Sequence, residues 1–95
     1  MRIVVEATLA PGRSGVTARA TRLRLASHGV DTMSATSRLQ AVVRAWAVSL
    51  ERGGWLGQAL DRTGVEHDVN GDGIDVVICS SIETGDAQAP ALAEA

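Results

Sequence analysis

The stretch that decides the fold is SRLQAVVRAWAVSL, residues 37–50. Ser37 and Gln40 match a capping box, in which the two side chains satisfy backbone groups of the first helical turn. Apolar residues then recur at helical spacing, namely Leu39, Val42, Val43, Trp46, Ala47 and Leu50. The pattern predicts an amphipathic helix that begins at Ser37 and packs this stripe, Trp46 included, against a core.

Gly53 and Gly54 should end this helix. If Gly54 takes the left-handed conformation, Trp55 falls where a Schellman cap brings it against Leu50. Residues 55–60 then predict a short second helix that stops before Gly64. Trp55 is also a candidate partner anchor, because tryptophan is enriched at interface hot spots, although burial within the domain is the simpler expectation.

Strands are expected on both sides of the helical region. Residues 2–9 alternate between apolar and polar side chains, which predicts a strand with one core face. Residues 65–69 and 74–80 flank an Asn-Gly turn at residues 70–73, which predicts an antiparallel hairpin. Because residues 74–79 are apolar almost without interruption, we expect the last strand to be buried on both faces.

Residues 16–28 fit two structures. Val16, Ala20 and Leu23 suit one face of a helix, with Ser14 as its cap and Gly29 as its stop, and we favour this interpretation. The alternative is a strand that forms a hairpin over residues 2–26.

The predicted fold is α+β: a small antiparallel or mixed sheet, made of the N-terminal strand plus the C-terminal hairpin and covered by one main helix. The sheet would have three strands, or four if residues 17–26 are extended. Residues 1–82 should form a single domain, and residues 83–95 a flexible tail rich in alanine, proline and acidic residues.

Composition sets the class of protein. The 95 residues are 45% hydrophobic but only 2% aromatic, and all nine basic residues are arginine. With no lysine, phenylalanine or tyrosine, the usage is typical of a GC-rich bacterial genome. The single cysteine excludes an intrachain disulfide, and no signal peptide or long apolar run is present, so we expect a cytoplasmic protein without a membrane partner.

Charge is divided along the chain. Residues 1–52 hold eight arginines against three acidic residues, whereas residues 53–95 hold one arginine against eight acidic residues. If both halves share one sheet, their fields cancel beyond a Debye length of about 8 Å.

Residues 68–73 resemble the start of an EF-hand or dockerin calcium loop, with oxygen ligands at its first, third and fifth positions and glycine at the sixth. Cys79 stands where the bidentate carboxylate should be, and a β pattern follows in place of a helix. We therefore expect an acidic hairpin turn and no metal site.

Five residues are candidates for anion binding: Arg13, Ser14, Arg19, Arg22 and Arg24. The loop at residues 12–15 lacks the spacing of a P-loop or a dinucleotide fingerprint. No aromatic residue is interleaved for base stacking, so a solvated face that neutralises the acidic half is the simpler interpretation.

Cys79, His28 and His67 lack the spacing of a zinc site or a nucleophile–base pair. Cys79 is expected to be a core thiol and His28 a residue of a helix end. We therefore expect no catalytic residue, no cofactor and no enzymatic activity.

The predicted function is a non-catalytic interaction or assembly module that self-associates or docks to a larger bacterial protein. A sheet of few strands under one helix leaves backbone edges to cover, and a core without phenylalanine or tyrosine favours an oligomer. The alternative is an anion or nucleic-acid binding regulator that uses the arginine-rich half.

Overall fold

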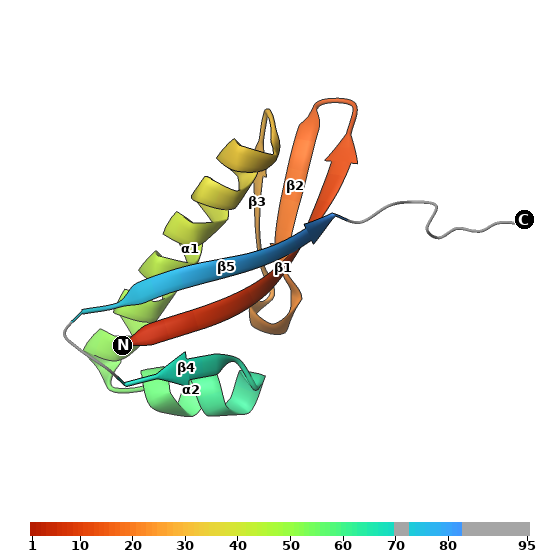
Figure 1. The fold of residues 1–95 in the computed structure, drawn as a ribbon. Coiled ribbons are helices and arrows are strands. Elements are labelled where there is room, and N and C mark those ends of the chain that lie inside the picture. The colour runs from red at the N-terminus through yellow and green to blue at the C-terminus, as the bar shows by residue number, and fades with distance from the viewer. Residues whose placement is uncertain (70–72, 83–95) are drawn as a thin grey trace, which may run out of the picture.

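A computed structural model describes residues 1–69 and 73–82 of the chain (Figure 1). Its elements, in chain order, are the strands β1 (Arg2–Gly12) and β2 (Gly15–Ala20), the 3-10 turn η1 (Thr21–Leu23), the strand β3 (Leu25–Gly29), the helices α1 (Thr32–Gly53) and α2 (Leu56–Thr63), and the strands β4 (Glu66–Asp68) and β5 (Asp75–Ile82). A five-stranded mixed sheet with one main helix confirms the predicted α+β class.

β1 is the central strand. Thr8 to Gly12 pair antiparallel with β2, and Arg2 to Val4 pair antiparallel with β4. Arg2 to Leu9 also pair with β5, in parallel. Because residues at both ends of β1 have a β5 partner as well, β2 and β4 share one edge of β1 and β5 occupies the other. β3 extends the sheet beyond β2.

This topology contradicts the predicted C-terminal hairpin. β4 and β5 run antiparallel to each other as expected, but β1 lies between them, so they do not form a hydrogen-bonded pair. β5 gains eight paired positions on β1, whereas the three-residue β4 could offer far fewer. The Asn-Gly turn that carried the prediction falls on residues 70–72, outside the described residues.

The favoured helix at residues 16–28 is wrong, and the alternative hairpin is closer to the structure. Val16, Ala18 and Ala20 are buried at every second position, which is the period of a strand. Arg13 and Ser14 form a two-residue turn between the paired Gly12 and Gly15. The pattern Val16, Ala20, Leu23 had suggested a helix because alanine fits either period.

The core lies between one face of the sheet and α1. The odd-numbered residues of β1, Ile3, Val5, Ala7 and Leu9, are at most 4% exposed. β5 departs from its prediction, because it pairs only with β1 among the described residues and is therefore an edge strand. Only its first half approaches the core, and Cys79, predicted as a core thiol, is exposed.

α1 begins at Thr32 rather than at Ser37. The cap is Asp31, whose carboxylate accepts a hydrogen bond from the Ser34 backbone N–H at 2.8 Å, while the Ser34 hydroxyl lies 3.3 Å from the Asp31 N–H. Gln40, predicted to serve the cap, instead donates from Nε2 to the carbonyl of Val76 in β5 at 2.8 Å.

The other end of α1 confirms the predicted Schellman cap. Gly54 has a φ of 78°, and the Trp55 N–H donates to the Leu50 carbonyl at 2.9 Å. Along the helix, Leu39, Val43 and Ala47 are fully buried. The predicted stripe was too wide, because Trp46 and Leu50 are only partly buried and Val42 is 36% exposed.

Replacement of Leu39 tests this placement of the stripe. Leu39→Ala should lower the free energy of unfolding by about 2–5 kcal/mol, because it leaves a cavity at a fully buried site. Val42→Ala, one turn along on the exposed side, should change it by less than about 1 kcal/mol. Urea unfolding of the two variants is the measurement, and equal losses would contradict this orientation of α1.

The cap also makes stability depend on pH. The hydrogen bonds from the Ser34 backbone and then its side chain hold the pKa of Asp31 below its ordinary value. A lowered folded-state pKa gives stability that is present above the unfolded pKa, about 3.9, and is lost as pH falls through the folded pKa. Asp31→Asn keeps a cap without the charge, so wild type should lose more of its unfolding free energy than this variant on acidification. Parallel losses in urea melts at neutral and acid pH would contradict the assignment.

Candidate functional site

The edge of β1 that faces β2 and β4 has a gap. β4 ends its pairing at Val4 and β2 begins at Thr8, so residues 5–7 have no strand partner on this side. Backbone groups alternate between the two edges along a strand, and the Met1 carbonyl accepts from Asp75 of β5. The N–H and C=O of Glu6 therefore face the gap.

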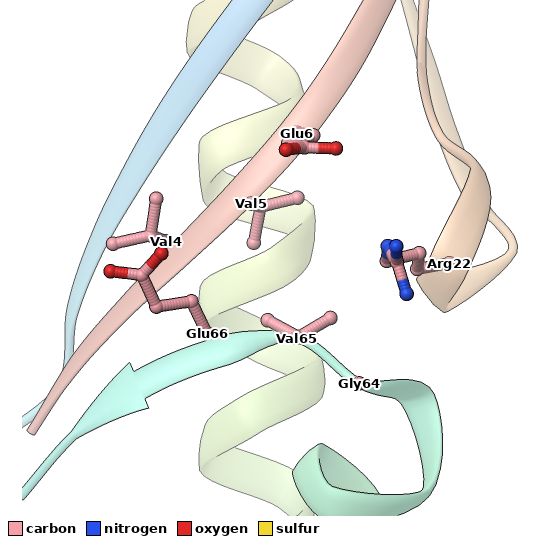
Figure 2. A pocket seen from close by; sticks show the side chains of 7 residues that line it. All are labelled: Val4, Val5, Glu6, Arg22, Gly64, Val65 and Glu66. Atoms are coloured by element: carbon pink, nitrogen blue, oxygen red, sulfur yellow. The ribbon is translucent and has the colours of Figure 1, made fainter.

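Arg22 of η1 reaches this gap from the other side. Its guanidinium donates to the carbonyl of Thr63, at the end of α2, at 3.4 Å. Figure 2 shows Arg22 across the gap from Glu6, with Val5 and Val65 at its floor and Glu66 beside Val4. The residues enclose a small cavity of about 150 Å³.

This cavity, called the β1 gap, can hold one small group that both donates and accepts hydrogen bonds. The side chains of Glu6, Glu66 and Arg22 leave it with one net negative charge, which disfavours an anion. Its lining of Val4, Val5, Glu6, Arg22, Gly64, Val65 and Glu66 has no hydroxyl, thiol or imidazole. The geometry is that of a minor polar recess rather than a catalytic centre.

Gly64 lies close to the guanidinium of Arg22. Its φ is 72°, and a Cβ there would lie 3.0 Å from a guanidinium nitrogen of Arg22. Gly64→Ala should lower the free energy of unfolding by about 1–2 kcal/mol, because the left-handed conformation strains any side chain. Gly57→Ala in α2, where open space surrounds the new methyl, should instead raise it by up to about 1 kcal/mol. Thermal melts of both variants check the contrast, and a neutral Gly64→Ala would contradict the left-handed conformation at this position.

A second candidate surface lies between α1 and the C-terminal half of β5. It is a groove of about 600 Å³, lined by Leu9, Thr32, Met33, Thr36, Ser37, Gln40, Ser80 and Ile82. Met33 is 80% exposed and Ile82 is 58% exposed, so large apolar side chains stand in solvent at both walls. The groove runs beside the edge of the sheet, where backbone groups are also available.

The structure does not gather the predicted anion-binding residues. Arg13 and Ser14 form the turn at one end of β2, whereas Arg22 and Arg24 follow its other end. Arg19 lies between them on the uncovered face of the sheet, in register with Thr8. Arg24 closes η1 with a φ of 58°.

Charges from the two halves of the chain do meet at the start of β1. Arg2 is in register with Asp68 on one side and Asp75 on the other. Its Nε lies 3.8 Å from the Asp75 carboxylate in an exposed ion pair. The expected interleaving of the two halves is therefore present here, although an exposed pair of this kind contributes little to stability.

Trp55, the candidate anchor, is 59% exposed and lies at the start of α2. A Cβ on Gly53 would lie 2.9 Å from its indole ring, so the ring rests over that glycine. Its backbone makes the Schellman contact, while more than half of its surface remains open.

Cys79, His28 and His67 lie apart in three different strands. His28 Nε2 lies 3.1 Å from the Ser14 carbonyl, and His67 Nδ1 lies 3.1 Å from the Val65 carbonyl. His28 lies near the end of the strand β3 rather than at the end of the predicted helix. Within residues 1–69 and 73–82, no three acidic, histidine or cysteine side chains cluster as metal ligands. The calcium-like segment is only partly described, since residues 70–72 fall outside.

No helix in the described ranges is both long and apolar enough to cross a bilayer.

No protein-family model, curated protein or solved structure matches the chain.

The signals for the two candidate surfaces were faint in the sequence. The groove depends on β5 being an edge strand, and its apolar residues predicted the opposite. The β1 gap depends on β2 and β4 sharing one edge of β1, a pairing that no short motif encodes.

Proposed function

We propose that the chain is a non-catalytic interaction or assembly module of a bacterial cytoplasm, which self-associates or docks to a larger protein. The observation that carries the proposal is the uncovered side of β5. This strand has one partner strand among the described residues, and beside it Met33 and Ile82 expose apolar surface. Natural sheets usually cover or charge such an edge, so an uncovered one favours pairing with another chain.

Further support comes from the rest of the apolar surface. Val30, Met33, Trp55, Val69 and Ile82 are all large side chains that are at least 58% exposed. Scattered single residues of this kind are ordinary, but Met33 and Ile82 lie on walls of the same groove. This pairing of apolar side chains with free backbone groups is what distinguishes the β5 side from the other surfaces.

The alternative, an anion or nucleic-acid regulator, has weaker support. Its candidate residues lie at opposite ends of β2, so they do not form one basic surface. Arg22 also shares the β1 gap with Glu6 and Glu66, whose carboxylates oppose binding of a polyanion.

Light scattering across a dilution series tests the proposed self-association. We expect a dimer or larger assembly at high micromolar concentration that dissociates on dilution, because backbone and apolar groups on the β5 side are then covered. A protein that remains monomeric at every concentration would remove self-association and leave docking to a different protein as the only form of the proposal.

Retention on heparin at low salt separates the alternative from the proposal. Wild type should elute early, and a triple variant with Arg19→Ala, Arg22→Ala and Arg24→Ala should elute at nearly the same salt concentration. Tight retention that the triple variant loses would favour the anion-binding function.

A further inference from the structure

Among the described residues, nothing pairs with the outer edge of β5 over its second half. Asp75 donates its N–H to the carbonyl of Met1, the residue before β1, so the even-numbered residues of β5 direct their N–H and C=O groups outward. Gln40 of α1 donates a hydrogen bond to the outward carbonyl of Val76. Within residues 1–69 and 73–82, no strand or side chain bonds to the outward groups of Ile78, Ser80 and Ile82, which we call the β5 edge.

The outer edge of β3, on the other side of the sheet, is better protected. β3 has five residues, and its pairing with β2 leaves only Ala26 and His28 directed outward. The carbonyl of His28 already accepts a hydrogen bond from Arg38 of α1 at 3.1 Å. A cationic side chain and a short strand are two devices that natural sheets use against edge-to-edge pairing. The β5 edge has neither, since β5 has eight residues and residues 76–82 carry no charge.

Because the β5 edge carries no charge, the β5 edges of two copies can pair without repulsion. Two copies that pair antiparallel through this edge bring no like charges together between residues 76 and 82. The two-fold axis then stands perpendicular to the sheet, so both α1 helices lie on the same face of the extended sheet. Ile78 of one copy falls opposite Ile82 of the other, which covers the exposed Ile82 side chain.

Charge on α1 adds complementarity to this arrangement. α1 runs antiparallel to β5, because Arg44 lies beside Asp75 and Val76, whereas Thr32 and Met33 lie beside Ser80 and Ile82. A two-fold axis at the middle of the β5 edge therefore sets Arg44, near the middle of one helix, toward the Asp31 end of the other. Arg44 has no ion-pair partner in the described part of its own chain.

We propose that two copies of the chain form a dimer through antiparallel pairing of their β5 edges, centred on Ser80, which joins the two sheets into one. The proposal rests on the proposed self-association and assigns it a surface, a register and a pair of charges. The β5 strand of a second copy then lies beside the groove between α1 and β5.

Proline substitution tests the edge directly. Ser80→Pro removes an outward N–H and should weaken the dimer by about tenfold or more in sedimentation equilibrium, because a ladder hydrogen bond is lost and the ring obstructs the partner strand. Ala26→Pro is the matched control, since it removes an outward N–H from the β3 edge and should leave the dimer unchanged.

A lysine at the same position gives a second variant for the case that the proline variant does not fold. Ser80 is exposed, so Ser80→Lys should fold, yet it sets two lysines against each other at the two-fold axis and should also weaken the dimer by about tenfold or more. Ala26→Lys should have no effect. If circular dichroism shows that Ser80→Pro is unfolded, the comparison of Ser80→Lys with Ala26→Lys decides.

Disulfide formation tests the register. In a Cys79→Ser background, Ser80→Cys should form cross-linked dimers rapidly on oxidation, because residues paired across a ladder have Cα atoms about 5.5 Å apart. Ala26→Cys in the same background should not form cross-linked dimers.

A charge reversal on α1 tests the proposed complementarity. Arg44→Glu should weaken the dimer by about tenfold, whereas Arg19→Glu on the uncovered face of the sheet should leave it intact.

The outcomes separate the two proposals. A wild-type protein that stays monomeric overturns the β5 dimer together with self-association. A wild-type dimer that survives both Ser80→Pro and Ser80→Lys, or that cross-links equally through residue 26, overturns the β5 dimer and leaves self-association through another surface.

Discussion

The pairing of β1 on both of its edges is the constraint on which the rest of the structure depends. Eight consecutive residues of β1 pair with β5, and the opposite edge is divided between β2 and β4. Because β1 pairs directly with β2, β4 and β5, its odd-numbered side chains form the centre of the core. α1 can then cover this face with little more than Leu39, Val43, Ala35 and Ala47 buried.

The position of α1 is fixed by polar contacts as well as by its apolar face. Gln40 donates to β5, and Arg38 donates to the carbonyl of His28 in β3. Ser27 of β3 also donates from its hydroxyl to the carbonyl of Ala35 at 2.8 Å. Since these bonds reach β3 and β5, which lie on opposite sides of β1, the helix fixes these two strands relative to each other. On β5 the last of these bonds is at Val76, and α1 makes no hydrogen bond to the remaining described residues of that strand.

Local signals in the sequence predicted part of this fold and missed part of it for physical reasons. The glycine cap after residue 53, the strand at residues 2–9 and the class of the fold follow from short patterns and were predicted. The start of α1 was missed because Asp31 with Ser34 is a less familiar capping box than Ser37 with Gln40. The last strand was misplaced because an apolar run does not reveal whether a strand lies in the middle or at the edge of a sheet. Which strands flank β1 depends on tertiary packing, so neither the β1 gap nor the β5 edge could be derived from residue patterns.

The placement of β5 against β1 also bears on how the chain reaches its native state. The first residue of β1 pairs with the first residue of β5, Arg2 with Asp75, so the central ladder closes only after nearly the whole chain is available. Such a topology has a high contact order, and domains of this kind fold more slowly than those built from neighbouring segments. During synthesis on the ribosome, β1, β2 and β3 can form a meander long before β5 emerges. Until then β1 presents an unpaired, apolar edge of its own, which makes the nascent chain dependent on rapid completion of its last strand.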